Sequence, residues 1–304
     1  ARGHGTDWPA GIQAEIECEA GEQVLGGEAV AALGLEAVLN AGQLEIKRLS
    51  IDHSAMKLDL TGRADLIRSR AGVDLDLRIG RLDKLAAYGV VGVGGRAGFE
   101  GHVDADWASE TKVDVDGQLR LGDIRASGTH VLSGSGEVRA KVLGTSAQAE
   151  GRMVLNRIRA PGAGVEQVSL VFEGSQSAGG DIALDAGLEV MSIEMDDGSL
   201  SMAELSGEVR ARVPARGDLV AQAKLDVSDF ALNKGAYQVD GGPVIFEASG
   251  DAVWADIDLR RQDAPFVKGR IDGNLATGEW RVSGFEFALK PNDGLVAQQN
   301  ISVT

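Results

Sequence analysis

Apolar and polar residues alternate along most of this chain, and the alternation is organised into a ten-residue pattern that occurs six times. The copies are GQLEIKRLSI from Gly42, GQLRLGDIRA from Gly117, GRMVLNRIRA from Gly151, AGLEVMSIEM from Ala186, AKLDVSDFAL from Ala223 and GEWRVSGFEF from Gly278. The middle copies recur about every 35 residues, a spacing typical of stacked supersecondary units. Because the period within each copy is two, we predict strands whose apolar side chains share one face.

Two spacer positions in a row interrupt the alternation inside each copy. A β-bulge at this point would let one extra residue bow out and return the following side chains to the same face. A second repeat supports the periodic organisation: SGEVRAKV at 135–142 returns as SGEVRARV at 206–213, and each copy leads into a ten-residue pattern.

The alternation and the turn residues between alternating runs predict strands nearly throughout the chain. The predicted strands are 11–19, 42–51, 55–61, 72–79, 96–107, 112–121, 136–143, 149–158, 165–173, 181–195, 206–213, 219–232, 243–249, 251–260, 267–275, 279–289 and 295–303. Helical patterns are confined to Leu82–Tyr88 and to the region between Glu22 and Asn40. Short turns between consecutive strands predict antiparallel pairing.

A sheet with one apolar face needs a cover, and the predicted helices are too short to supply it. The apolar positions are mostly Val, Leu, Ile and Ala, whereas a sandwich core normally uses large aromatic residues. We therefore predict an all-β fold: an elongated, antiparallel, curled sheet, or repeating β-groove, with one or two short helices. Residues 1–41 form a partly helical leading segment, and residues 42–304 form the groove array.

Composition excludes some functions. The chain has 304 residues, 42 glycines, 4% aromatic residues and a formal net charge of −16. The missing clusters of Lys and Arg argue against nucleic acid as a partner, and the acidity disfavours electrostatic docking to anionic lipid heads. Cys18 is the only cysteine, so no intrachain disulfide is possible. No apolar run approaches the length of a membrane span. Because both ends break the pattern midway, we expect a stretch of a larger, anchored protein.

Motifs that carry chemistry are sparse. Gly92, Gly94 and Ala97 match the dinucleotide-binding spacing, but an alternating strand pattern follows where a helix is needed, so a flexible joint is the preferred interpretation. The D-x-D pairs of Asp74 with Asp76, Asp104 with Asp106, and Asp114 with Asp116 fit the solvated face of strands better than a calcium loop.

The sequence also lacks signals for a catalytic nucleophile or a metal site. His4, His53, His102 and His130 are far apart in sequence and lack zinc-ligand spacing. No nucleophile motif is present. We expect neither catalytic residues, nor a metal, nor a cofactor.

Several segments resemble the repeating β-groove region of the AsmA-like superfamily, most closely its TamB branch. They are SGEVRAKV with the small-residue break at Gly144, AEGRMVLNRIRA at 149–160, VEQVSLVFEG at 165–174, LTGRADL at 60–66 and RLDKLAAYG at 81–89. The resemblance implies a non-enzymatic protein of the periplasm of a Gram-negative bacterium, tethered to the inner membrane by a segment outside this chain. It also implies phospholipid or another acyl-chain lipid as cargo, and an Omp85-type outer-membrane barrel or another envelope protein as partner.

The phase of the alternation predicts which side chains line the groove. The predicted lining residues are Leu44, Ile46, Val73, Leu75, Leu77, Ile79, Leu119, Leu121, Val138, Val142, Met153, Leu155, Val209, Val213, Leu225, Val227, Ile257, Leu259, Trp280 and Val282. Two other interpretations remain open. One is a structural or adhesive β-rich surface protein with a closed core, to which the same residues would belong. The other is an enzyme on a β-solenoid with clustered carboxylates.

Overall fold

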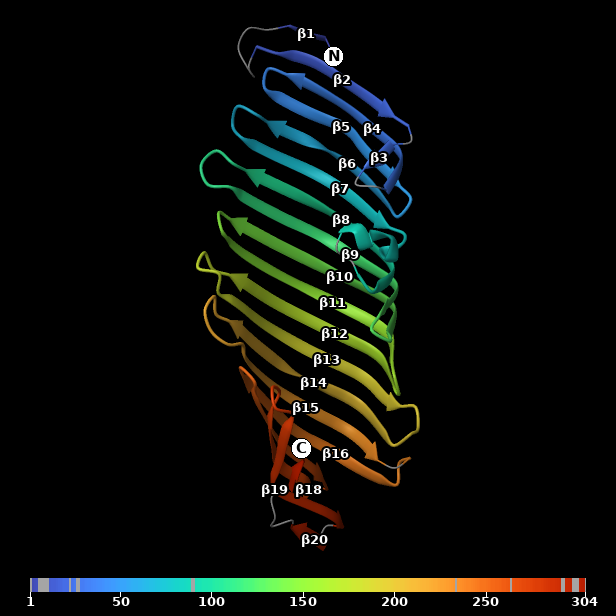
Figure 1. Ribbon diagram of the computed structural model, residues 1–304, viewed down its shortest axis with the longest axis vertical. Helices are drawn as coiled ribbons and strands as arrows, with labels where there is room; N and C mark the ends of the chain where they lie inside the picture. The colour runs from blue at the N-terminus through green and yellow to red at the C-terminus, as the bar shows by residue number, and fades with distance from the viewer. Residues whose placement is uncertain are drawn as a thin grey trace. The chain divides into compact units, whose positions relative to one another are not determined.

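The protein is an all-β antiparallel meander, seen in a computed structural model that describes residues 2–4, 11–21, 23–25, 28–88, 91–232, 234–262, 264–290, 293–296 and 301–303. The chain consists of two compact units, Ala1–Met153 and Val154–Thr304. In each unit, most strands pair with the strand that follows them in the chain (Figure 1). The predicted all-β, antiparallel fold class is thus confirmed at this level.

The first unit contains ten strands in its described residues, and β11 crosses its boundary. The strands are β1 (Arg2–His4), β2 (Gln13–Ala20), β3 (Gln23–Leu25), β4 (Glu28–Asn40), β5 (Gln43–His53), β6 (Met56–Asp65), β7 (Arg70–Ile79), β8 (Val93–Asp106), β9 (Lys112–Ala126), β10 (Thr129–Leu143) and β11 (Ser146–Ala160). β2 pairs with both β1 and β4, and the short β3 pairs with the start of β4. From β4 to β10 each strand pairs with the next.

The second unit continues with the same local topology. Its strands are β12 (Ala163–Gln176), β13 (Ile182–Met195), β14 (Leu200–Val213), β15 (Val220–Leu232), β16 (Tyr237–Ser249), β17 (Ala252–Arg261), β18 (Ala264–Asn274), β19 (Glu279–Lys290), β20 (Asp293–Val296) and β21 (Ile301–Val303). Pairing is sequential from β12 to β19, and both β20 and β21 pair with β19.

The helical segment predicted between Glu22 and Asn40 is wrong, because Glu28–Asn40 is strand β4. Its Leu, Ala and Glu residues favour a helix when taken singly. However, Leu33, Leu35 and Leu39 recur with an even spacing, and they pair in register with Ile51, Leu49 and Leu44 of β5. The pairing overrides the intrinsic preference. The other predicted helix is present as the 3-10 helix η1 (Leu82–Tyr88), and the described residues contain no α-helix.

The bulge predicted in each ten-residue pattern is confirmed as a shift of register in three copies. In β5 the shift falls between Ile46 and Leu49, and in β19 it falls around Gly284, whose φ is 57°. In β9 the extra residue is Asp123, which has a φ of 57° and lies opposite a register shift between Gly94 and Arg96 of β8. Asp123 is held by His130 Nε2 at 2.7 Å and by Arg125 at 3.0 Å, and the His130 hydrogen bond, followed by Arg125, lowers the pKa of its carboxyl.

Two further copies of the ten-residue pattern accommodate the extra residue without a register shift. Ser192 in β13 and Asp229 in β15 have φ values of 53° and 47°, and each leaves the ladder while its neighbours stay in step. Arg157 of β11, at the same position of its copy, has a φ of 53°. Val227 and Phe230 flank Asp229, lie three positions apart and share one buried cluster. The kink therefore returns the apolar side chains to the same face, as predicted.

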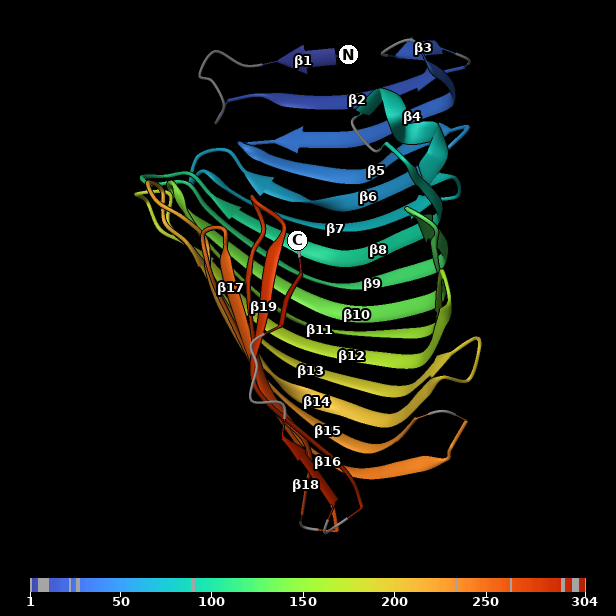
Figure 2. The same cartoon turned by 60° about the horizontal axis from the view of Figure 1, so that its bottom comes forward.

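The strands bow along their length (Figure 2), but the sheet is not strongly curled. The curled sheet expected from the sequence is therefore corrected to a sheet of gentler curvature. Strands such as β9 and β10, each with 15 residues, remain paired along nearly their whole length. The kinks at the bulged residues add local bends to this ladder.

The main core of described residues lies in the second unit. Val227, Phe230, Val239, Leu259 and Phe266 form a buried cluster, and Phe287 packs its ring edge-on against Phe266 with the centroids 5.2 Å apart. These residues come from β15, β16, β17, β18 and β19. This end of the second unit therefore closes on itself with aromatic side chains, as a conventional protein core does.

We predict that Gly95→Ala destabilises the protein while Gly94→Ala does not. Gly95 has a φ of 118°, and an added Cβ would lie 2.5 Å from the carbonyl oxygen of the bulged Asp123, whereas a Cβ on Gly94 meets nothing within 4 Å. The expected loss for Gly95→Ala is about 1–3 kcal/mol in the free energy of unfolding. Urea denaturation measures it; equal stability of the two variants would contradict this account of the bulge.

We also predict that Phe266→Ala costs about 3–5 kcal/mol in unfolding free energy, because it opens a cavity in the closed cluster. Phe246→Ala is the matched control, since the Phe246 side chain is 37% exposed and Phe266 only 1%. Thermal and denaturant unfolding of both variants test the difference. A comparable loss at the two positions would show that the exposed side chain is packed as tightly as the buried one.

Candidate functional site

The register of the first unit collects its apolar side chains on one face. Leu75 of β7 lies opposite Leu60 of β6 and Gly101 of β8, and Gly101 lies opposite Gly117 of β9. Register partners and alternate residues share a face. The apolar face of the first unit thus contains Leu44, Ile46, Leu49, Ile51, Leu58, Leu60, Val73, Leu75, Leu77, Ile79, Phe99, Val103, Val113, Val115, Leu119, Leu121, Val138, Ala140 and Val142.

The opposite face of the same strands is charged. Register rows across it bring together Asp59, Asp76 and Glu100 in one line and Asp74, His102 and Asp116 in the next. Salt bridges join neighbouring strands, including Arg63 to Glu45 at 3.0 Å. This polar face of the first unit is solvated, and it separates cleanly from the apolar one.

Little of the described protein covers the apolar face of the first unit. Its elements contact mainly their ladder neighbours, and η1 contacts β8. Among the described residues of this unit, the buried apolar side chains are the small residues Ala37, Ala55 and Ala64 together with Leu39 and Leu85. Most other residues of the face are half-buried.

A ring lying over glycines shapes the middle of the apolar face. An added Cβ on Gly117 would come within 2.5 Å of Phe99 Cζ, and one on Gly101 within 2.9 Å of Phe99 Cε1. The two glycines therefore leave the space that the Phe99 ring occupies. We did not predict Phe99 as a lining residue, although its alternation with Ala97 and Val103 is a signal that could have found it.

The second unit has its own apolar face. Leu188 of β13 lies opposite Leu170 of β12 and Gly207 of β14, and Gly207 lies opposite Leu225 of β15. At one end of these strands the face is open, since Ile182, Leu184, Val213 and Phe246 have exposed side chains. At the other end the Phe266 cluster fills it with protein.

The predicted lining residues lie on these two faces. Apart from Met153 and Leu155, which alternate on β11, the strand registers place all of them on the apolar face of their unit. Three are exposed, namely Val142, Val213 and Trp280. Val227 and Leu259 are buried in the protein-filled cluster, and Ile257 packs against it. The remaining residues are half-buried.

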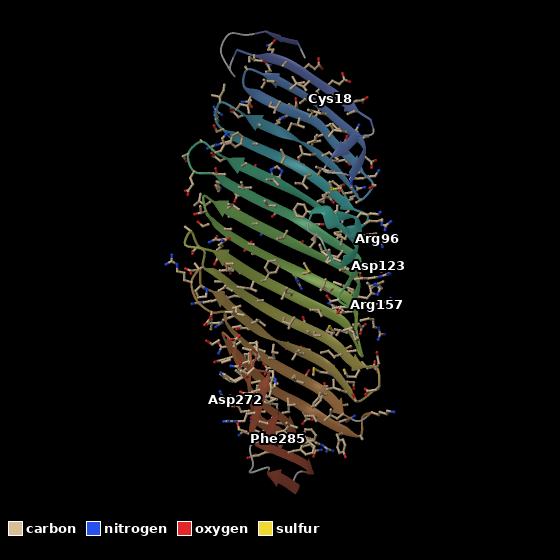
Figure 3. The ribbon with its side chains drawn as sticks, in the orientation of Figure 1. Cys18, Arg96, Asp123, Arg157, Asp272 and Phe285 are labelled. Atoms are coloured by element: carbon tan, nitrogen blue, oxygen red, sulfur yellow. The ribbon has the colours of Figure 1, made fainter. Side chains whose placement is uncertain are left out.

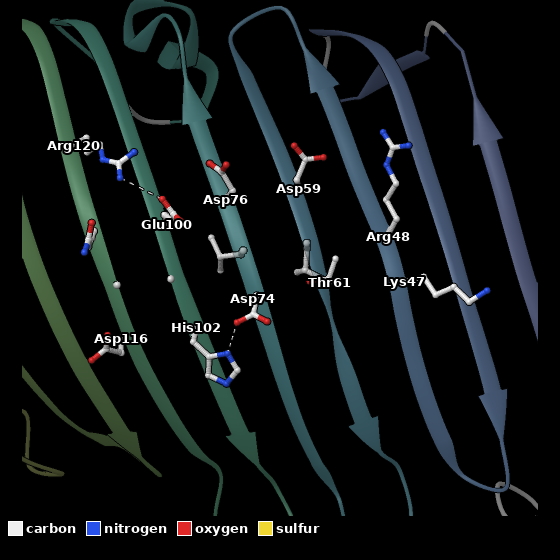
Figure 4. A pocket seen from close by; sticks show the side chains of 15 residues that line it. Lys47, Arg48, Asp59, Thr61, Asp74, Asp76, Glu100, His102, Asp116 and Arg120 are labelled. Atoms are coloured by element: carbon white, nitrogen blue, oxygen red, sulfur yellow. Dashed lines mark hydrogen bonds and ion pairs between the residues drawn. The ribbon is translucent and has the colours of Figure 1, made fainter.

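The polar face of the first unit carries an open hollow of about 830 Å³ (Figure 4). Its lining includes Asp59, Asp74, Glu100, His102 and Arg120, which come from β6 to β9. The sequence did not reveal this hollow, because it depends on how adjacent strands bend. Figure 3 draws the side chains on the strands and labels Arg96 and Asp123 of the first unit.

His102 is one of the residues that line the hollow. Its Nδ1 is 2.7 Å from Asp74 Oδ1 and its Nε2 is 3.3 Å from Asp104 Oδ1. The hydrogen bond to Asp74 is the main cause of a raised His102 pKa; desolvation opposes the shift, and Asp104 adds to it. Asp116 also faces this imidazole from the paired position on β9.

The other chemical motifs have structural roles. The glycines of the dinucleotide-like motif lead into strand β8 instead of a helix, and Gly95 accommodates the Asp123 bulge. The three D-x-D pairs lie on the charged face, as predicted. The described residues hold no group of three His, Cys, Asp or Glu side chains that could bind a metal ion. The side chain of His4 lies outside the described residues.

No family model, curated protein or solved structure matches the chain. Among the described residues, no helix is long and apolar enough to cross a membrane.

We predict that His102 stabilises the fold only at lower pH. Because its folded pKa is raised, its contribution is complete below the unfolded value of about 6.5 and disappears as the pH rises through the folded pKa. His102→Asn should therefore lower the melting temperature at pH 5.5 and have a smaller effect at pH 9. Asp74→Asn is the control, because it removes the main hydrogen-bond partner of His102. In that background the effect of His102→Asn on the melting temperature should be similar at the two pH values. A gap between wild type and His102→Asn that is constant with pH would contradict the assignment.

Proposed function

We propose that this protein binds the acyl chains of phospholipids on its apolar faces and carries them between membranes. The observation that supports this function is the register of β5 to β10, which gathers aliphatic residues on one face of a layer that few described residues cover. A half-exposed aliphatic surface on one side of a layer is typical of a binding site for a partner or a lipid.

The energetic argument follows from the aliphatic surface. Covering one exposed CH₂ group is worth about 0.8 kcal/mol, so a tail of a dozen carbons gains roughly 10 kcal/mol before entropy losses. The lining is built mainly from Val, Leu and Ile, which present similar surfaces from strand to strand. Adjacent positions then bind a tail with similar affinity, a condition that favours movement along the face.

The opposite face of the layer is charged, which agrees with acyl-chain binding on the aliphatic face only. Charged rows such as Asp74, His102 and Asp116 keep the polar face hydrated, so only one side of the layer attracts acyl chains. The gentle curvature fits a shallow β-groove in which lipid, instead of a second protein layer, covers the aliphatic residues.

The resemblance to the AsmA-like superfamily supplies the cellular setting of the proposal. On that basis the protein acts in the periplasm of a Gram-negative bacterium, supports outer-membrane biogenesis and works with an Omp85-type barrel or another envelope protein.

A structural or adhesive role is the second candidate, and the Phe266 cluster favours it. There Phe230, Phe266 and Phe287 pack together and cover the apolar side chains at one end of the second unit. A protein that only needs a rigid β scaffold would close its apolar face in this way.

Lipid extraction from the purified chain, followed by mass spectrometry, tests the proposed function. We expect co-purified phospholipid with the wild type and a loss of at least about tenfold in bound lipid for Leu75→Asp combined with Leu119→Asp. Both side chains belong to the apolar face of the first unit, and a carboxylate there repels an acyl chain.

The matched control is Thr61→Asp combined with Gln118→Asp. It adds the same charge to strands β6 and β9, but on the polar face. Circular dichroism and melting temperature establish that each variant is folded. If the wild type carries no lipid, or if both double variants lose lipid equally, the transport proposal fails and the structural role is favoured.

A further inference from the structure

One edge of the first unit exposes a large apolar side chain at each of three successive turns. Ile67 and Trp107 lie in the turns that follow β6 and β8, and Leu143 is the last residue of β10, beside the next turn on this edge; their exposures are 56%, 41% and 49%. We propose that this edge, named here the apolar turn edge, docks on the surface of a zwitterionic lipid bilayer, with these three side chains inserted among the lipid headgroups. In Figure 1 these turns lie on the side of the unit opposite η1.

Backbone hydrogen bonds hold the three turns in a row. Trp107 donates its N–H to the carbonyl of Ser69 at 2.8 Å, which joins the turns after β6 and β8. Gly144 donates to Thr111 at 2.9 Å, which joins the turns after β8 and β10. Because successive turns on one edge are two strands apart, their tips lie about 10 Å from one another. The backbone of the protein therefore fixes the spacing of the three side chains along one edge.

The other edge of the unit differs in its turns. The connections after β5 and β9 have small residues at their tips, Ser54 with Ala55 and Ser127 with Gly128. Val91, in the connection that contains η1, is an exposed apolar residue on that edge. On the apolar turn edge the turn after β4 has the small residues Ala41 and Gly42, and a large apolar residue recurs at each described turn of the first unit from β6 onward.

The charges beside the apolar tips favour a neutral lipid surface. Arg70 pairs with Asp106 at 2.9 Å, and Lys112 pairs with Asp114 at 2.7 Å. This pairing leaves the edge close to electrical balance although the whole chain carries −16. Repulsion from phosphate is thereby avoided without the basic patch that anionic lipids require.

The form of the edge favours a bilayer over a protein partner. Separate apolar tips with polar residues between them match an interface in which Trp and aliphatic side chains enter among headgroups while charges stay in water. A protein interface instead needs a continuous, well-packed surface. The second unit repeats the feature, with Ile182, Leu219 and Leu275 exposed at or beside the turns after β12, β14 and β18.

This inference goes beyond the proposed function and stands without it. Acyl-chain binding concerns the apolar face of the first unit, whereas docking concerns the turn edge. A protein that inserts three side chains into a membrane need not transport lipid. Variants of the turn edge and variants of the apolar face therefore test the two activities separately.

Co-sedimentation with vesicles of phosphatidylcholine tests the edge. We expect the wild type to bind and Ile67→Ser, Trp107→Ser and Leu143→Ser combined to weaken binding at least about tenfold, because the inserted apolar area is removed. The control is Val91→Ser with Leu132→Ser, which removes two exposed apolar side chains outside the apolar turn edge. Leu75→Asp should bind vesicles normally, so failure of lipid carriage and failure of docking give different results.

Fluorescence supplies an independent measurement. A variant with Trp8→Phe, Trp254→Phe and Trp280→Phe keeps Trp107 as the only tryptophan. We expect its emission to shift to the blue on phosphatidylcholine vesicles and to be quenched by brominated acyl chains. Absence of vesicle binding by the wild type, equal binding by the edge variant, or an unshifted Trp107 emission would overturn the proposal. So would a change of self-association, measured by sedimentation velocity, as the only effect of the edge variant.

Discussion

The pairing register of the strands is the constraint on which the rest of the structure depends. A shift by one residue would exchange the two faces of a strand, because side chains alternate with a period of two. In the first unit Leu60, Leu75 and Gly101 lie in register while Asp74 and His102 lie in register on the reverse side. The apolar face, the charged hollow and their separation all follow from this one alignment.

The kinks preserve that alignment where the sequence breaks its own period. Asp123 and Asp229 take left-handed backbone conformations, so one residue leaves the ladder and the next apolar side chain returns to its face. Glycine is needed where the opposite strand approaches such a kink closely, as Gly95 does at Asp123. The ten-residue pattern therefore places a kink wherever an extra residue breaks the two-residue period.

The two units cover similar apolar faces in different ways. In the second unit, Phe230, Phe266 and Phe287 close one end into a packed cluster. In the first unit the described residues offer η1 and small buried alanines, and its aliphatic residues remain half-buried. Aromatic side chains fill volume between elements, whereas aliphatic ones on a single layer leave a surface for something else to cover.

The sequence by itself determined the strands, their faces and the positions of the bulges, because each depends on residues close together in the chain. The alternation around Leu75 and the doubled spacer before Ile124 are local signals. Local preference misled at β4, where helix-forming Leu and Ala residues pair with β5, and the short strands β1 and β3 were not predicted. Tertiary structure alone decided that Val227 and Leu259 are enclosed, that Phe99 lies over Gly117, and that the charged face is hollowed around His102. These features depend on how distant strands bend and pack against one another, and no local period encodes that curvature.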